Sequence, residues 1–499
     1  MSRWSLLALL ACTAIPFLAR AAEPPEYDFP PGFQWGTSTA AYQVEGGNLH
    51  SDWAAWEALG KIHGKQKNGK ATDHFTRFRE DFALASQINT NAYRFSIEWS
   101  KIEPERDRID EAMIAHYRTM ILAMREQGLT PYLTLHHFTT PIWLMNFKDP
   151  GKGHFQTVET VKQFLEFVEL VVARFGDLVD HYWTLNEPTI LSMNGYLTGN
   201  FPPGVALPPG EVARALWMLL RNKSLEQLIA SSPQGKMFVR SLYTLLLCHI
   251  RAYDLIKAKD LVDADGDGVA ASVGLAHQYV ALNAETFRAF PAFGTMMDRF
   301  NNDLLRTLKS GKVDIFGNIG LSPEEVSLPA ATITNRMDVL GINYYTSLRF
   351  RDLLELAVTQ FTGLKLGFLS KEKSSDLMGI KVRPDGLYRV LKETYANYGW
   401  GLMVTENGIA THDEVFRTTY LVAHLIRIAR LLDEGVPVRG YFHWSLIDNF
   451  EWHLGTAPRF GLIEVDYTTF ERRVKASALA YAEIAKLNAI PPNLLPSSR

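Results

Sequence analysis

The sequence predicts a single α/β domain, a (β/α)8 barrel with inserted loops and helices over the barrel mouth. Eight short runs rich in β-branched and aromatic residues alternate with longer segments of helical period, which indicates repeated βα units. No complete GxxxxGK(S/T) phosphate loop of the kind common in open parallel sheets occurs, and no shift in composition marks a domain boundary. A closed barrel has no strand edges, whereas an open sheet of eight strands leaves two.

The eight predicted strands cover the following segments in chain order: 33–43, 91–99, 130–138, 180–188, 270–280, 338–345, 401–408 and 439–446. The clearest predicted helix carries apolar residues at helical spacing from Val161 to Phe175 and is closed by Gly176. Another runs through Ile114 and Met124 towards Gly128.

Two stretches break this alternation, at 200–262 and 345–375. Their apolar helices, such as ALWMLL and SLYTLLL, exceed a minimal βα unit. Because inserted loops at the top face of a barrel shape the substrate entrance, we expect both stretches to lie over the mouth and to influence which leaving group is accepted.

Composition excludes several classes of protein. The 499 residues are 47% hydrophobic and 21% charged, with a formal charge of -3, which is typical of a soluble globular enzyme. No Lys/Arg run is interleaved with aromatic residues, so nucleic acid is not an expected partner. The oligomeric state stays open.

Residues 1–21 are predicted to form a signal peptide that is cleaved, and residues 22–499 the catalytic domain. Export to the periplasm or the outside of the cell is therefore expected. Arg3 supplies the positive charge, residues 4–18 the apolar stretch, and Ala19-Arg20-Ala21 the cleavage site. Three alternatives remain: a membrane anchor, a buried helix, and lipid attachment at Cys12. No later segment is apolar enough to span a membrane, so none is expected in the mature chain.

Two further features each have a structural and a functional interpretation. Cys248 lies in the apolar run LLLCHIRAY and is interpreted as a core thiol, with a catalytic cysteine as the alternative. The acidic stretch from Asp263 to Gly268 resembles the start of a calcium loop, but Gly274 occupies the position where a bidentate Glu is expected. A solvated turn is the preferred interpretation there.

Glutamates end the fourth and the seventh predicted strands. Glu187 lies in TLNEP and Glu406 in VTENG. Since the carboxyl ends of barrel strands converge on one mouth, both carboxyl groups are predicted to face the same cavity. Retaining glycosidases use such a pair at roughly 5 Å, one group attacking the anomeric carbon and the other protonating the leaving oxygen. A lone glutamate at a strand end would more often be a structural ion-pair partner.

Other polar residues lie at the same predicted strand ends. Arg94 can keep a nucleophilic carboxylate ionised, or else bridge strands as scaffold. Tyr345 can donate to the same carboxylate, and Asn186 can bond a sugar hydroxyl, although either could be a satisfied core group.

A third group supplies the mixture of hydrogen-bonding groups and aromatic faces that grips a sugar ring: Gln43, His137, Glu451 and Trp452. Trp444 would add a stacking floor, with core packing as the equally weighted alternative. Without HExxH, CxxC pairs or His-x-His, no metal is expected, and without a GxSxG elbow a serine hydrolase has no support.

These motifs together resemble those of the family 1 glycoside hydrolases, the β-glucosidase family. The resemblance runs from FQWGTSTAAYQVEGG at 33–47 through YRFSIEW, TLNEP, GINYYT and VTENG to GYFHWSLIDNFEW at 440–452. It implies a TIM barrel that needs no cofactor and cleaves β-glycosides with retention. It implies the following roles: acid/base for Glu187, nucleophile for Glu406, glycone binding for Gln43, His137, Asn186, Glu451 and Trp452, nucleophile support for Arg94 and Tyr345, and a platform for Trp444.

Some positions depart from the family pattern. Phe138 stands where an indole is usual, and Ile380 and Thr456 replace Trp and Tyr of the rim, so these positions bear on glycone preference. Glu451 is retained, and its charge would repel a 6-phosphate.

The sequence therefore predicts an exo-acting retaining β-glycosidase, foremost a β-glucosidase, acting on a small β-glycoside or oligosaccharide. Transglycosylation at the same site is an alternative that the sequence does not separate. A non-catalytic sugar-binding protein of the same fold is the alternative from a different class, and it would be expected to lack one carboxyl group.

Overall fold

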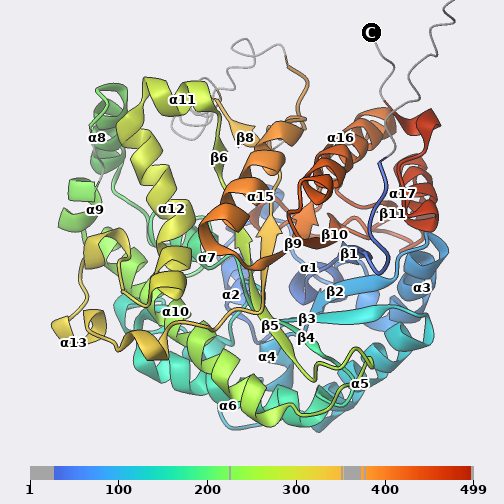
Figure 1. Cartoon of the computed structure of the whole chain (residues 1–499). Helices are drawn as coiled ribbons and strands as arrows, with labels where there is room; N and C mark the ends of the chain where they lie inside the picture. Colours follow the sequence, from blue (N-terminus) through green and yellow to red (C-terminus); the bar gives the residue numbers. More distant parts are fainter. Residues whose placement is uncertain (1–26, 224–225, 350–351, 353–371, 376–377, 496–499) are drawn as a thin grey trace, which may run out of the picture.

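The computed structural model describes residues 27–223, 226–349, 352, 372–375 and 378–495. Eight parallel strands form a closed barrel in the order β1-β10-β9-β7-β5-β4-β3-β2, surrounded by helices (Figure 1). The barrel strands are β1 Gln34–Ser38, β2 Ala92–Ser96, β3 Thr130–His136, β4 His181–Asn186, β5 Ser272–Gln278, β7 Val339–Asn343, β9 Gly401–Asn407 and β10 Val438–Trp444. Seven of them fall inside the predicted segments, and β10 begins one residue before its segment 439–446, so the predicted (β/α)8 barrel is confirmed.

One long helix follows each barrel strand. These helices are α3 His74–Gln87, α5 Glu111–Glu126, α6 Val158–Phe175, α10 Pro233–Lys259, α12 Pro291–Ser310, α15 Pro384–Tyr398, α16 Glu414–Asp433 and α17 Ala476–Leu487. The predicted helix before Gly176 is α6, which ends at Phe175. Asp110 caps α5 by accepting from the backbone N–H groups of Ala112 and Met113.

Shorter elements decorate the loops. They are α1 Ala41–Glu45, α2 Asp52–Ala58, α4 Trp99–Ile102, α7 Pro188–Tyr196, α8 Pro209–Leu220, α9 Glu226–Ser231, α11 Ala284–Ala289 and α13 Pro323–Val326, with β6 Ala281–Leu282 paired to β8 Ser347–Leu348 and β11 Ile463–Val465 paired to β12 Arg472–Val474.

The predicted insertion at 200–262 is only partly correct. Helices α8 and α9 are additions to the βα unit, but α10 packs against α6 and the strands β4 and β5, so it is the barrel helix of this unit. Its SLYTLLL segment is apolar on nearly every side because it is covered by α6, α7 and the barrel together. Of the second predicted insertion, residues 350–351 and 353–371 lie outside the described residues.

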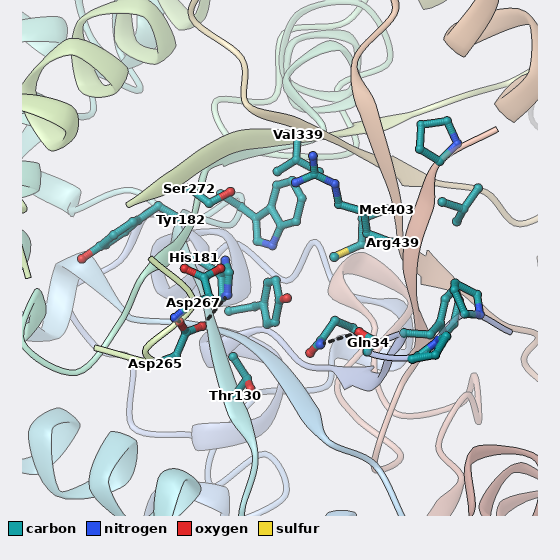
Figure 2. Close-up of a pocket in the computed structure, with 18 of the residues that line it drawn as sticks. Gln34, Thr130, His181, Tyr182, Asp265, Asp267, Ser272, Val339, Met403 and Arg439 are labelled. Atoms are coloured by element: carbon teal, nitrogen blue, oxygen red, sulfur yellow. Dashed lines mark hydrogen bonds and ion pairs between the residues drawn. The ribbon is translucent and has the colours of Figure 1, made fainter. Parts of the chain in front are cut away.

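The amino ends of the strands enclose a cavity of about 470 Å³, shown in Figure 2. It is lined by residues at the strand starts, among them Gln34, Thr130 and Ser272, and by His181 and Asp265, whose Nε2 and Oδ2 atoms lie 3.1 Å apart. A layer of buried side chains fills the barrel interior on the side of this cavity that faces the carboxyl ends of the strands: Ala92, Tyr132, Trp183, Val339, Met403 and Phe442. This packed layer separates the lower cavity from the carboxyl ends of the strands.

The remaining expectations concern Cys248, the acidic stretch and membrane spans. Cys248 is fully buried, as expected for a core thiol, and burial raises the pKa of its thiol. Asp263 accepts hydrogen bonds from the backbone N–H groups of Gly266 and Gly268 within a turn, and the solvated turn stays the prediction there, with calcium binding as the alternative. Within the described part of the chain, no helix is long and apolar enough to cross a membrane. The predicted signal peptide lies outside the described residues.

Candidate active site

Glu187 and Glu406 line one cavity of about 520 Å³ at the carboxyl ends of the barrel strands. Glu187 follows β4 directly, and Glu406 is the sixth of the seven residues of β9. Glu187 has a left-handed backbone with φ 45°, a conformation uncommon outside glycine, and Pro188 then begins α7. The strand β4 therefore ends directly before Glu187. Both glutamate side chains are almost completely buried in the cavity wall.

Two donors hold the Glu406 carboxylate. Arg94 Nη1 lies 2.5 Å from Oε1, and the Tyr345 hydroxyl donates to Oε2 at 2.6 Å. Arg94 is fully buried on β2, with Glu406 as its counter-ion. A buried cation that bonds a carboxylate directly favours the ionised form of that carboxylate, and the two bonds leave lone pairs free for an incoming electrophile. Arg94 and Tyr345 thus make the contacts that the sequence suggested.

Glu187 has a different environment. Its Oε1 accepts a single hydrogen bond of 2.7 Å, from Asn343 Nδ2. Burial raises the pKa of Glu187 well above its ordinary range, and the nearby charge of Glu406 raises it further. Glu187 therefore tends to keep its proton, while Glu406 is paired with the Arg94 cation, the difference that a general acid and a nucleophile require.

Sequence reasoning missed Asn343. This residue ends β7 and connects the two halves of the site, since its side chain donates to Glu187, contacts Asn186 Oδ1 at 3.2 Å and accepts from the Thr405 hydroxyl at 2.6 Å. The signal was present, because Asn343 is the polar residue at the carboxyl end of a predicted strand in GINYYT. Within that motif, the sequence favoured Tyr345, two residues later, as the site residue instead.

The Asn186 amide fixes the protonation of His137. Asn186 Oδ1 accepts from Arg94 Nη2 at 2.7 Å, so its amide nitrogen faces His137 Nε2 at 3.1 Å. Because arginine only donates, His137 Nε2 must accept, and the proton of the neutral imidazole lies on Nδ1. Burial, together with the Arg94 charge, lowers the pKa of His137 and keeps it neutral. Nδ1 is buried with no hydrogen-bond partner among the described residues, which leaves it free to donate to a sugar hydroxyl.

Glu451 and Gln43 form a second polar group. Gln43 Nε2 donates to Glu451 Oε2 at 3.1 Å and to Asn449 Oδ1 at 2.9 Å, while Gln43 Oε1 has no partner within the described structure. Burial and the charge of Glu406 raise the pKa of Glu451 to about 8. The carboxyl group is therefore largely protonated at neutral pH in the empty cavity, and the predicted repulsion of a 6-phosphate is strong only at higher pH.

Aromatic rings complete the wall. His137 lies between Trp444 and Trp452, with ring centroids 5.9 Å from each and nearly parallel planes. Phe138 lines the cavity in the place of the usual indole and meets Trp452 edge-on at 5.1 Å. Ile380 also lines the cavity, whereas Thr456 bonds Gln66 and is not among the lining residues.

Eight of the ten predicted site residues line this cavity: His137, Asn186, Glu187, Tyr345, Glu406, Trp444, Glu451 and Trp452. The other two, Gln43 and Arg94, are not among the lining residues but bond Glu451 and Glu406, respectively. The arrangement can hold a sugar ring through several free hydrogen-bonding groups and present its anomeric carbon to a paired carboxylate and carboxylic acid.

Comparison with known proteins places the chain among glycosidases. Residues 26–490 match the model of glycosyl hydrolase family 1. The chain is 30% identical to β-glucosidase A of Thermotoga maritima, over 93% of this chain and 98% of the relative, and 31% identical to β-glucosidase 4 of Oryza sativa, over 94% and 97%.

Solved structures agree. A β-glycosidase from Pyrococcus horikoshii superposes with a TM-score of 0.74 at 32% identity, covering 95% of this chain and 99% of the other. The family 1 β-glucosidase of Thermotoga maritima in complex with isofagomine lactam superposes with a TM-score of 0.76 at 27% identity, covering 93% and 99%.

Proposed function

The chain belongs to glycosyl hydrolase family 1 and is a retaining β-glycosidase, and we propose that it is an exo-acting β-glucosidase in which Glu406 is the nucleophile and Glu187 the general acid/base. The observation that carries this assignment is the placement of both glutamates in one cavity, with Glu406 paired to the Arg94 cation and the pKa of Glu187 raised by burial. Relatives named β-glucosidase support the choice of glucose.

The proposed reaction has two steps at one anomeric carbon. In the first, the Glu406 carboxylate forms a bond to that carbon while the bond to the leaving oxygen breaks and Glu187 gives its proton to that oxygen. In the second, Glu187 takes a proton from water, the water oxygen bonds the same carbon, and Glu406 is released. Two inversions give net retention, and Glu187 regains its proton for the next cycle.

Six residues are proposed to bind the glycone. Asn186 has an amide proton available for the sugar 2-hydroxyl, a contact that strengthens as positive charge develops on the ring. His137 Nδ1, Gln43 Oε1 and Glu451 would bond the remaining hydroxyls, with Trp444 and Trp452 against the apolar ring face. The transglycosylation alternative uses the same groups with an alcohol in place of water.

The test measures substrate choice and stereochemistry together. We expect the highest kcat/KM on nitrophenyl β-D-glucoside within a panel that includes the β-galactoside, the β-fucoside and the α-glucoside. NMR of the first turnovers should show β-glucose appearing before mutarotation. Release of α-glucose first would contradict the retaining assignment, and no turnover of any β-glycoside would favour the non-catalytic alternative. A galactoside preference would overturn only the choice of glucose.

We further propose that the protein is exported after cleavage behind Ala21. The support is the sequence pattern alone: one basic residue, an apolar stretch and the small residues Ala19 and Ala21. Intact mass spectrometry of the protein from the periplasm or medium of a secreting host should give an N-terminus at Ala22. An N-terminus at an acylated Cys12 would support lipid attachment instead, and an intact Met1 in the cytoplasm would contradict export.

A further inference from the structure

We propose that the natural aglycone of this enzyme is a neutral, apolar alcohol, such as an alkyl or polycyclic alcohol, and not a second sugar. The inference rests on the proposed function and concerns the same cavity. It is carried by six apolar side chains of the cavity lining, here called the apolar wall: Met193, Phe201, Phe238, Met296, Met297 and Phe300.

The apolar wall and the sugar-binding groups come from different parts of the fold. Glu187, Glu406 and His137 lie at strand ends, whereas the apolar wall comes from α7, the loop after it, α10 and α12, all labelled around the barrel in Figure 1. A substrate whose glycone occupies the strand ends therefore extends its leaving group towards the helices. The leaving group meets the apolar wall.

Charge in the cavity excludes ionic leaving groups. The acidic residues among the described lining residues are Glu187, Glu406 and Glu451, all near the glycone position, and the described lining includes no lysine or arginine. An aglycone bearing phosphate, sulfate or carboxylate would therefore find carboxyl groups and no cation. A cationic aglycone would find no acidic partner along the apolar wall.

The hydrogen bonds that a second sugar needs are scarce. A pyranose presents several hydroxyls, and each one buried without a partner weakens binding. Among the polar lining residues beyond the glycone groups, Asn194 Oδ1 already accepts from the Thr198 hydroxyl, Thr346 donates to the Lys381 carbonyl, and the Tyr279 hydroxyl bonds Asn302. Among the described lining residues, the amide nitrogen of Asn194 and the side chains of Gln278 and His453 remain. These are few partners for the several hydroxyls of a buried sugar ring.

Three of the six side chains of the apolar wall are methionines. Methionine is unbranched and polarisable, so Met193, Met296 and Met297 can adapt to leaving groups of varied outline. Phe201, Phe238 and Phe300 are nearly fully buried and give the wall a rigid backing. Cleavage then releases an alcohol ROH whose oxygen has received the Glu187 proton, and its apolar body is what the wall contacts.

The experiment measures kcat/KM on n-alkyl β-D-glucosides from ethyl to octyl below their micelle concentrations, on cellobiose, and on β-D-glucosyl fluoride. Each added methylene should raise kcat/KM by up to about fourfold, the factor expected for complete burial of a CH2 group. Octyl glucoside should exceed cellobiose. A flat alkyl series, or cellobiose turned over as well as octyl glucoside, would overturn the inference.

Variants localise the effect. Met296→Gln keeps the side-chain length on half-buried Met296 and should lower kcat/KM on octyl glucoside by roughly tenfold, since an amide is desolvated against the chain. The fluoride, which has no aglycone, should be unaffected. Met113→Gln on α5, half-buried away from the cavity, is the matched control. If glucosyl fluoride is not hydrolysed by the wild type, the proposed function fails, whereas hydrolysis of the fluoride with a flat alkyl series defeats the apolar aglycone alone.

Discussion

Replacement of Glu406 by glycine is expected to lower kcat on nitrophenyl β-D-glucoside by roughly ten-thousandfold or more, the range seen when a covalent nucleophile is removed. Arg94 and Tyr345 lose the carboxylate that they hold, and no other described lining carboxylate is paired with an arginine. The variant leaves open space at the position of the nucleophile. Sodium azide should fill it, restore turnover and give the α-glucosyl azide.

The azide product is the decisive measurement, because it separates a missing nucleophile from a misfolded protein. A variant at an exposed glutamate, Glu105→Gly, serves as the control and should keep wild-type activity without azide. Full activity of Glu406→Gly without azide would contradict the assignment of the nucleophile. So would azide rescue that yields the β-anomer.

Replacement of Glu187 by alanine should produce a loss that depends on the leaving group. General acid catalysis contributes roughly a hundred- to ten-thousandfold. We expect a loss of that size in kcat/KM on alkyl glucosides, whose oxygen needs the proton, and a small loss on dinitrophenyl glucoside, whose oxygen does not. Deglycosylation should become the slow step for the good leaving group, so a burst of dinitrophenol should appear. Azide should accelerate that step and give the β-glucosyl azide.

The pH profile checks the same residue. Glu187 must carry its proton in the first step, and burial beside Glu406 raises its pKa, so kcat/KM stays high well above the ordinary range of a glutamate and falls as pH rises through that pKa. Glu187→Gln should remove this alkaline limb. Glu451, with a pKa of about 8, titrates nearby, and Glu451→Gln separates its contribution. Equal losses on both kinds of leaving group, with the limb retained in Glu187→Gln, would contradict the role of Glu187.

The sequence predicted the barrel strands well because their signal is local. The segment around β9 combines buried β-branched residues with a polar end, and both features can be recognised from residues adjacent in the sequence. The same logic brought Glu187 and Glu406 together, since strand ends of a closed barrel converge on one mouth. Residue chemistry at the strand ends suggested the roles of Arg94 and Tyr345, and the motif resemblance then assigned the nucleophile to Glu406.

Other features depend on packing that no local pattern reports. Helix α10 was assigned to an insertion because it is apolar on nearly all sides, and only its neighbours α6 and α7 explain that composition. Asn343 was missed because its importance lies in the partners that it joins, Glu187 and Asn186. The pKa of Glu451 likewise depends on its burial beside Glu406.

The electrostatic interaction between Glu406 and Glu187 has a consequence for the order of the two catalytic steps. While Glu406 is an anion, its field helps Glu187 keep its proton, which suits the departure of the alcohol. Once Glu406 is esterified to the sugar, that anion has disappeared, and Glu187 releases a proton more readily. The same side chain then accepts a proton from water without moving. Formation of the covalent bond at Glu406 thus converts Glu187 from an acid into a base.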